Sequence, residues 1–345
     1  MDRRVLTQDL TEIFTALGVP EADGAMTASG LIQAEQWGVC SHGVLRAERY
    51  ARCLRSGGIL PRASFRILRQ NCGWVQASAD GGLGIPASMR AADLAVRLAR
   101  EYGIGVVNIR QSHHNGAEGL YSHSIAQRGM IGIAMSTGNP VMAATGAAET
   151  VIGNNPFSYA LPAGRFAPIM LDIAMSAVAD GKVQIARALG QSLPPGCILD
   201  RDGRPSQDPE DYFHGGVLLP FGAHKGFGLA VMVECLAGIL SGAGMLDEID
   251  SWNERPGVCG NTGHLIAALD ISKMMPLEDF CSRVEELILR IKSAKPAEGV
   301  DAIHYPGELE HLRAKAAGDS VALLPAATAS LEKAAEIAGV KLHSL

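Results

Sequence analysis

The stretch that decides the fold is residues 74–110, WVQASADGGLGIPASMRAADLAVRLAREYGIGVVNIR. Its start, WVQAS at 74–78, is typical of a strand, and GGLG at 81–84 is typical of a turn. The middle, residues 87–103, carries apolar residues at helical spacing and predicts an amphipathic helix. IGVVNIR at 104–110 predicts a short buried strand. A strand, a helix and a second strand in this order indicate an α/β fold.

The same alternation continues on both sides of this stretch. The apolar spacing predicts further strands over residues 130–137, 168–174 and 264–270. It predicts further helices over residues 116–129, 225–240, 277–294, 307–317 and 328–338. The first 56 residues are helical in pattern throughout, with helices expected over residues 6–18, 20–38 and 42–56.

These patterns predict three parts along the chain. Residues 1–74 form an N-terminal helical region that ends after the glycine pair Gly57–Gly58. Residues 75–305 form an α/β core with a ligand site, and residues 306–345 form C-terminal helices that pack back on this core.

Composition excludes several classes of protein. The 345 residues have a net charge of −6 without clustered lysine or arginine, so we expect no nucleic-acid or anionic-membrane partner. Seven cysteines, without a CxxC pair, indicate reduced buried thiols and neither disulfides nor a metal centre. The amphipathic start MDRRVLTQDL is unlike a signal peptide, and no apolar run reaches the ~18 residues of a membrane span. We therefore expect a cytoplasmic protein.

The segment SHGVLRAERY at residues 41–50 places His42, Arg46 and Tyr50 four residues apart. On a helix these three side chains would share one face. Imidazole transfers protons near neutral pH, and guanidinium binds a carboxylate through two parallel hydrogen bonds. The set suits a small 2-oxo or 2-hydroxy acid, with Ser41 capping the helix or orienting the imidazole. The alternative is a solvated polar face behind a serine cap.

A second candidate site is SHHNGAEGLY at residues 112–121, where a predicted strand ends and a helix begins. Such junctions bind ligands in α/β proteins and direct backbone N–H groups at anions. His114 is a second acid/base candidate, and Gly116, Ala117 and Gly119 would let a phosphate approach closely. The alternative is an ordinary loop. We expect no metal here, because adjacent histidines seldom point the same way.

Four further motifs are weak when taken singly. They are IGNNP at 152–156, DIAMSAVADGK at 172–182, GAHKGFG at 222–228 and YPGELEHLR at 305–313. The sequence has no GxGxxG after a strand and no GxxxxGK[ST], so neither the Rossmann nor the P-loop interpretation applies.

Taken in order, these motifs resemble one family, the malate/L-lactate dehydrogenase-like NAD(P)-dependent oxidoreductases, which are distinct from the Rossmann-type enzymes. The matching run covers nearly the whole chain: SHG with Arg46, SHHNGA, IGNNP, D-x-A-x-S with GK, HKGFG, GHLIAALD and PGE. The resemblance implies the family's own α/β fold, with a helical N-terminal region and a non-Rossmann dinucleotide site. It also implies a homodimer that transfers hydride between NAD or NADP and a small 2-oxo/2-hydroxy acid.

The resemblance also implies roles for residues at matching positions. Catalytic roles fall on Ser41, His42 and His114, and either histidine can be the proton donor. Substrate binding falls on Arg46, Tyr50 and Asn154. Cofactor contacts fall on Asn115, Gly116, Ala117, Glu118, Gly119, Asp172, Ile173, Ala174, His224, Lys225, Pro306, Gly307 and Glu308.

The chain departs from the family pattern at four positions. Asn154 stands where GTNP has threonine, Asn115 stands where an aromatic or aliphatic residue is common, and Asp180 stands where many members have arginine. An acid at residue 180 would disfavour a dicarboxylate if its side chain faced the pocket. Lys182 takes the position of the charge-relay aspartate in the branch that reduces cyclic imino acids, which argues against that alternative activity. A non-catalytic binding module is a further alternative, opposed by the intact set of SHG, Arg46 and His114.

Overall fold

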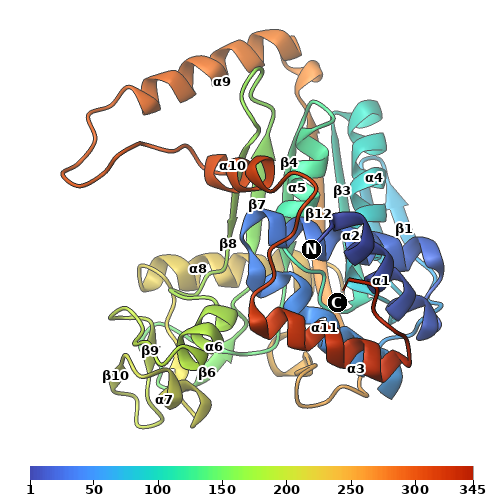
Figure 1. The fold of residues 1–345 in the computed structure, drawn as a ribbon. Helices are drawn as coiled ribbons and strands as arrows, with labels where there is room; N and C mark the ends of the chain where they lie inside the picture. Colours follow the sequence, from blue (N-terminus) through green and yellow to red (C-terminus); the bar gives the residue numbers. More distant parts are fainter. Residues whose placement is uncertain (345) are drawn as a thin grey trace.

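The structure, a computed structural model that describes residues 1–344, contains a seven-stranded sheet with the order β1-β2-β3-β12-β4-β7-β8 (Figure 1). Strands β2 and β3 are parallel, and the other neighbours in this sheet are antiparallel. Its strands are β1 Arg66–Asn71, β2 Trp74–Ser78, β3 Ile104–Ser112, β4 Met130–Ser136, β7 Phe157–Leu161, β8 Ile169–Ile173 and β12 Thr262–Asp270. The stretch at 74–110 therefore forms the parallel β2-α4-β3 unit that the sequence predicted.

A smaller sheet with the order β10-β9-β11-β5-β6 lies beside the large one. Its strands are β5 Met142–Ala143, β6 Thr150–Ile152, β9 Ile198–Leu199, β10 Pro205–Ser206 and β11 Val217–Leu218. These five strands, together with β1 and β7, were not predicted from the sequence. Two- or three-residue strands are too short to show a period, so no pattern could have revealed most of them.

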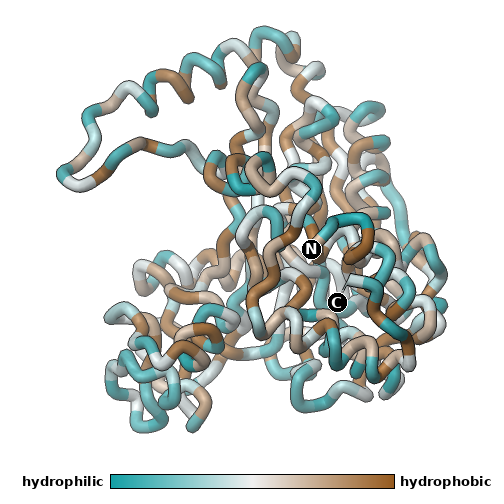
Figure 2. Tube along the Cα trace, in the orientation of Figure 1, coloured by the Kyte–Doolittle hydropathy of each residue, from teal (hydrophilic) through white to brown (hydrophobic). Residues whose placement is uncertain are grey.

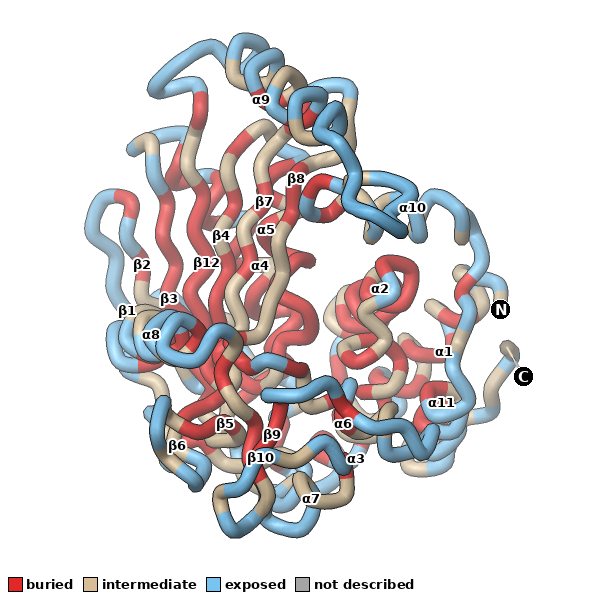
Figure 3. The backbone as a smooth tube through the Cα atoms, turned by 90° about the vertical axis from the view of Figure 1, so that its left-hand side faces the viewer, coloured by how far each residue is buried: buried red, intermediate tan, exposed pale blue. Residues whose placement is uncertain are grey.

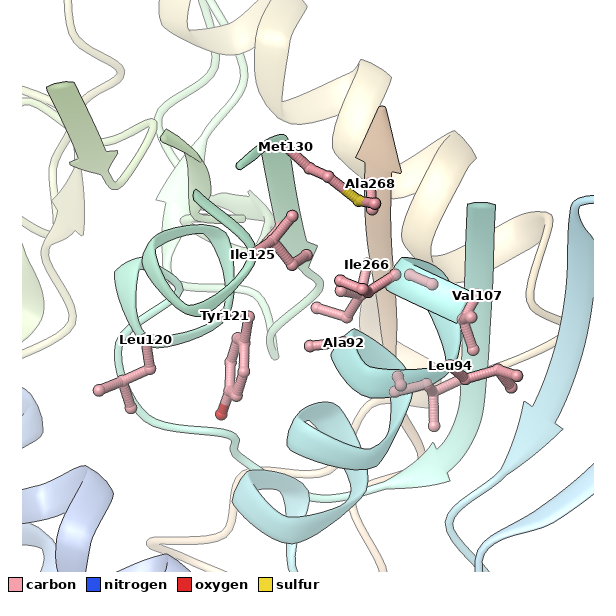
Figure 4. Packing of buried hydrophobic residues seen from close by; sticks show 14 of the residues in the cluster. Ala92, Leu94, Val107, Leu120, Tyr121, Ile125, Met130, Ile266 and Ala268 are labelled. Carbon is pink, nitrogen blue, oxygen red and sulfur yellow. The ribbon is translucent and has the colours of Figure 1, made fainter. Parts of the chain in front are cut away.

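Helices α4 and α5 cover one face of the large sheet (Figures 3 and 4). Figure 4 shows Ile125 of α5 close to Ile266 of β12 and Tyr121 of α5 on the side that faces Ala92 of α4, all of them buried. The helices are α1 Arg3–Ala16, α2 Glu21–Trp37, α3 Ala47–Ser56, α4 Gly84–Tyr102, α5 Gly119–Ala126, α6 Asp180–Ala188, α7 Pro209–Phe213, α8 His224–Val233, α9 Leu277–Lys292, α10 Glu308–Ala317 and α11 Pro325–Ala338. None of the helices in residues 1–344 has both the length and the apolar character to cross a bilayer.

The N-terminal helices form their own apolar core with the end of the chain. Buried side chains of α1, α2 and α3 pack with those of α11, whose Leu331 is fully buried. Both termini lie on this side of the molecule (Figure 1), where the Met1 amino group donates to the carbonyl of Val321. The predicted three-part division of the chain stays a prediction.

The helix predicted over residues 42–56 is wrong in its first half. Two 3-10 turns, η1 Cys40–His42 and η2 Val44–Arg46, come first, and the α-helix begins only at Ala47. The cause is Glu35 of α2, whose carboxylate accepts a hydrogen bond from the backbone N–H of Val44 at 2.8 Å. A Cβ at Gly43 would lie 2.3 Å from a Glu35 oxygen, so glycine is required where the two segments cross.

The other predicted elements are present with shifted ends. The helix predicted over 116–129 spans only α5, and the helix predicted over 225–240 is α8 followed by a π-helical segment, η3 Glu234–Ile239. Two more 3-10 turns, η4 Leu246–Glu248 and η5 Ile271–Lys273, flank β12. Helix α9 extends away from the rest of the chain, with hydrophobic residues among hydrophilic ones (Figures 1 and 2).

Candidate active site

A cleft of about 2600 Å³ lies between the N-terminal helices and the sheet. Its walls come from distant parts of the chain: residues 37–42, 113–118, 170–174, 176–182, 249–255 and 304–307. A pocket for a drug-sized ligand is about 300–1,000 Å³, so this cleft can hold a dinucleotide and a small substrate together.

The two candidate histidines meet inside this cleft. The rings of His42 and His114 are nearly parallel, 15° apart, with their centroids separated by 5.6 Å. The Ser41 hydroxyl lies 2.9 Å from Nδ1 of His42, as the orienting role requires. Although they do not share a helix face, His42 and Arg46 still reach one site because the 3-10 turns direct them there.

Hydrogen bonds fix the tautomer of neutral His114. The backbone N–H of Gly116 donates to Nδ1 at 3.3 Å, and the Tyr50 hydroxyl lies 2.7 Å from the same atom. Because a backbone N–H can only donate, Nδ1 must be the unprotonated nitrogen. Nε2 then carries the proton and has no hydrogen-bond partner in residues 1–344. This nitrogen is free to meet a substrate oxygen.

Burial keeps both imidazoles neutral. Desolvation, with a smaller contribution from the charge of Arg46, lowers the pKa of His42 to about 3. Desolvation and the neighbouring His42 and Arg46 lower the pKa of His114 well below its ordinary value. Each ring is therefore a hydrogen-bond donor and acceptor at neutral pH.

Arg46 is a buried guanidinium that lacks an acidic partner. Its side chain is 4% exposed, and no carboxylate of residues 1–344 lies within 4.0 Å of it. Its Nε donates to the Ser41 carbonyl at 2.6 Å, which leaves the two terminal nitrogens for other partners. Desolvation, aided by the charge of Arg49, lowers its pKa to about 10. Burial of an unpaired cation is costly, so an anion is expected to bind here.

Asp180, one of the departures from the family pattern, lies on the cleft wall close to this cation. Its oxygens accept hydrogen bonds from Gln184 at 2.7 Å and from the Tyr212 hydroxyl at 3.1 Å. Its charge raises the pKa of Arg46 and of Arg49, in opposition to desolvation. The acid therefore offsets part of the positive charge beside the site.

Asn154, which replaces the usual threonine, and its neighbour Asn155 have different surroundings. Asn155 is fully buried at φ +31°, where its amide donates to Glu234 at 2.7 Å and to the Ala230 carbonyl at 3.0 Å. Asn154 lines the cleft. Asn155 thus supports the loop, and Asn154 is the amide that a substrate can reach.

The remaining length of the cleft fits a dinucleotide. The backbone N–H of Gly119 donates to Asp172 at 2.7 Å, and Ile173 and Ala174 continue the wall. Beside them, Pro306 and Gly307 also line the cleft, and a Cβ at Gly307 would lie 2.8 Å from the backbone of Met170.

Glu118, like Arg46, has a buried polar side chain that could bind a ligand. Its carboxyl is buried in the cleft wall beside Gly116 and Ala117, and neither oxygen has a hydrogen-bond partner in residues 1–344. Desolvation, followed by the charge of Asp172, raises its pKa well above the ordinary value. A neutral carboxyl can donate to a ribose or carboxamide group. Asn115, by contrast, is buried and donates to Ser88 at 3.3 Å.

Four predicted cofactor residues do not line the cleft: Gly119, His224, Lys225 and Glu308. His224 and Lys225 are exposed at the start of α8. Glu308 pairs with Lys292, with His304 at 3.1 Å and with the backbone N–H of Tyr305 at 3.3 Å. Its carboxylate therefore secures the turn before α10 against the end of α9.

Trp252 was not predicted from the sequence, and its ring stacks on that of His114 with a centroid separation of 4.5 Å and an angle of 17°. Arg49 was not predicted either, and its guanidinium lies 5.7 Å from the centre of the same indole. Trp252 could have been found as a tryptophan in a polar loop, and Arg49 by its i, i+3 spacing from Arg46. Glu35 gave no signal, since its role depends on tertiary contact.

The chain is similar to known proteins over most of its length. The family model described as malate/L-lactate dehydrogenase matches residues 1–332. A malate dehydrogenase from Pyrococcus horikoshii is 36% identical over 306 residues, covering 87% of this chain and 84% of that protein. A Delta(1)-pyrroline-2-carboxylate/Delta(1)-piperideine-2-carboxylate reductase from Pseudomonas putida is also 36% identical, over 300 residues, covering 87% and 86%.

Solved structures share the fold. The sulfolactate dehydrogenase from Methanocaldococcus jannaschii superposes with a TM-score of 0.92 at 30% identity, covering 100% of this chain and 98% of that chain. The resemblance expected from the motifs and the family's α/β fold are thereby confirmed. The chain belongs to the malate/L-lactate dehydrogenase family of NAD(P)-dependent oxidoreductases.

Proposed function

We propose that this protein transfers a hydride between a nicotinamide dinucleotide and a small 2-oxo/2-hydroxy acid. The observation that carries the proposal is Arg46, a buried and unpaired guanidinium beside the stacked rings of His42 and His114. The cation provides a site for the carboxylate, and the imidazoles provide a proton for the neighbouring oxygen.

The chain's own residues position the substrate and supply the proton. The terminal nitrogens of Arg46 hold the carboxylate, and Nε2 of His42 or His114 donates to the substrate oxygen. In the reverse direction, the same nitrogen accepts the hydroxyl proton. When bound, the dinucleotide supplies or accepts the hydride.

Anion binding adjusts the proton donor. The positive charge of Arg46 contributes to the low pKa of His42 and of His114 in the free protein. A carboxylate on Arg46 cancels part of this field, so the pKa of either imidazole rises when the substrate binds. The imidazole thus binds a proton more readily when the substrate occupies the site than in the free protein.

We assign the cofactor contacts to the cleft wall around Glu118, Asp172 and Gly307, with either NAD or NADP as the cofactor. Cofactor binding by His224 and Lys225 stays a prediction, and both side chains lie outside the cleft.

The proposed hydride transfer is tested by the absorbance of the reduced nicotinamide, with each cofactor and a panel of 2-oxo acids that includes malate-, lactate- and sulfolactate-type substrates. Absence of turnover with every acid and both cofactors would refute the proposal.

A cyclic imino acid reductase is the second candidate, favoured by the identity to the Pseudomonas putida enzyme. Lys182 argues against it, because its exposed ammonium cannot relay charge as an aspartate would. A steady-state comparison of a cyclic imino acid with an open-chain 2-oxo acid separates the two. Higher kcat/KM for the imine would favour the second candidate.

We also propose a homodimer. Along β4 and β7, half-buried apolar residues such as Ile133 and Tyr159 alternate with buried ones, on a sheet face that α4 and α5 do not cover (Figure 3). At one end of this face, Ile239 of η3 and Leu240, which follows it, are 54% and 50% exposed. Exposed apolar groups of this extent are typical of a surface that a second subunit covers.

A further inference from the structure

Trp252 lies in the irregular segment between η4 and β12, and this segment is fixed to the end of α3. The Trp252 carbonyl accepts a hydrogen bond from Sγ of Cys53 at 3.7 Å. A Cβ at Gly58 would lie 2.3 Å from the carbonyl oxygen of Pro256, so the two backbones are in direct contact. Arg255 pairs with Asp250 at 2.5 Å and braces the turn. The indole is therefore held in place by its own segment.

One indole ring contacts the groups that the proposed reaction needs. It stacks on His114 with a centroid separation of 4.5 Å, and the Tyr50 ring lies at 5.3 Å. The guanidinium carbons of Arg46 and Arg49 lie 5.9 and 5.7 Å from its centroid, within cation–π distance. The His113 ring meets it edge-on at 5.4 Å.

These contacts act on both the proton donor and the carboxylate site. An apolar ring over one face of His114 excludes water from the imidazole, and desolvation is the largest cause of its lowered pKa. The other charged or titratable groups that face His114 are His42, His113, Arg46, Arg49 and Tyr50. The first four lower the pKa as well, and the Tyr50 hydroxyl lies 2.7 Å from Nδ1. Cation–π attraction also restricts Arg46 and Arg49 to positions above the ring.

We propose that Trp252 is a positioning residue of this enzyme, which holds the His114 ring in register with Arg46 and shields it from water. The inference rests on the proposed function for its kinetic consequences, although its structural part can be tested without turnover. Loss of the indole admits water, and the pKa of His114 then rises toward its ordinary value. Arg46 loses one of its restraints at the same time, so carboxylate binding weakens.

The kinetic test compares Trp252→Ala with Trp252→Phe, which keeps an aromatic face. Trp74→Phe is the matched control, since Trp74 is 51% exposed on β2 and is not part of the cleft. We expect Trp252→Ala to raise KM for a 2-oxo acid at least ~10-fold and to shift the pH profile of kcat/KM upward by about one pH unit. Trp252→Phe should restore both values to near wild type, and Trp74→Phe should not change them.

A binding test works even if the physiological substrate differs from the panel. Oxamate, a non-reducible analogue of a 2-oxo acid, is titrated into the protein with bound cofactor while tryptophan emission is recorded. All proteins in this titration carry Trp37→Phe, because Trp37 also lines the cleft. In this background we expect an emission change when Trp252 is intact, with or without Trp74→Phe, and none in Trp252→Phe.

Two results would overturn the role of Trp252. One is a folded Trp252→Ala protein with wild-type KM and pH profile. The other, which holds even if the alanine variant does not fold, is an oxamate-induced emission change that persists in Trp252→Phe. A panel without turnover, combined with the expected emission change, would reject the proposed function and leave the placement of Trp252 intact.

Discussion

Arg46 lowers the stability of the protein because it is buried without an ion-pair partner, and the same unpaired charge makes it a binding site for a carboxylate. An unpaired guanidinium at 4% exposure costs desolvation free energy that no carboxylate of residues 1–344 offsets within 4.0 Å. Replacement of buried charges by apolar residues of similar volume is often neutral or stabilising, by about 1–4 kcal/mol. We therefore predict that Arg46→Met has an unchanged or higher Tm and a steeply raised KM for carboxylate substrates. Thermal unfolding and steady-state kinetics check this, and a markedly lower Tm would show that Arg46 is structural.

A second prediction concerns His42 and His114, the two candidate proton donors. A positioned acid contributes about 10²–10⁴-fold to turnover, so removal of the proton donor should lower kcat by at least ~100-fold. We predict this loss in His42→Ala or His114→Ala, measured under saturating cofactor. His214→Ala is the control, because this side chain is 71% exposed at the turn that follows α7. Near-normal turnover in both active-site variants would reject imidazole as the proton source.

The elements that bring these residues together were predictable only in part. Residues 74–110 gave the β2-α4-β3 unit because its apolar spacing is long and regular. The break before α3 was not predictable, because Glu35 imposes it from another helix. Trp252 was missed for a similar reason, since its partners are remote in sequence. Local sequence patterns were thus enough to identify the motifs, whereas tertiary contacts determine how these motifs are arranged in the site.

The tight crossing of Gly43 and Glu35 leads to a prediction at the element scale. A methyl group at Gly43 would lie 2.3 Å from Glu35 and would force η1 and η2 apart. Gly43→Ala should therefore lose about 1–3 kcal/mol of stability and most of the activity, because His42 and Arg46 flank the glycine. Gly228→Ala, where a Cβ would meet nothing within 4 Å, is the control. Wild-type activity in Gly43→Ala would show that this crossing does not position the site.

Buried histidines make the whole molecule sensitive to acid. Desolvation lowers the pKa of His264 to about 3 and that of His113 to about 4, from an ordinary value of 6.5. The unfolded chain binds these protons below pH 6.5 and the folded chain does not, so stability is lost as pH falls from 6.5 toward these lower values. At pH 5, each of these two histidines should lower the free energy of unfolding by about 2 kcal/mol relative to neutral pH.

Denaturant unfolding at pH 7.5 and pH 5.0 measures this loss. His264, which bonds to Ser136 and Ser112 inside the sheet, is the informative position. His264→Gln should show a smaller difference in stability between the two pH values than wild type. Equal differences would mean that His264 is not the acid-sensitive group.

The proposed dimer is tested at the same scale. Ile239→Glu places a charge on the exposed apolar end of η3 and should convert the dimer to monomer in light scattering after gel filtration. Leu68→Glu is the control, because Leu68 is 46% exposed on the edge strand β1. A wild-type protein that is monomeric at micromolar concentration would contradict the proposal.

The central claim is that Arg46 grips the substrate carboxylate within reach of an imidazole. The direct measurement is kcat/KM for a 2-oxo acid and for its uncharged carboxamide, in wild type and in Arg46→Ala. Because two charge-assisted hydrogen bonds are at stake, wild type should prefer the acid by at least ~100-fold, and the variant should show almost no preference. An equal preference for the acid in both proteins would contradict the account, since the carboxylate would then be held elsewhere.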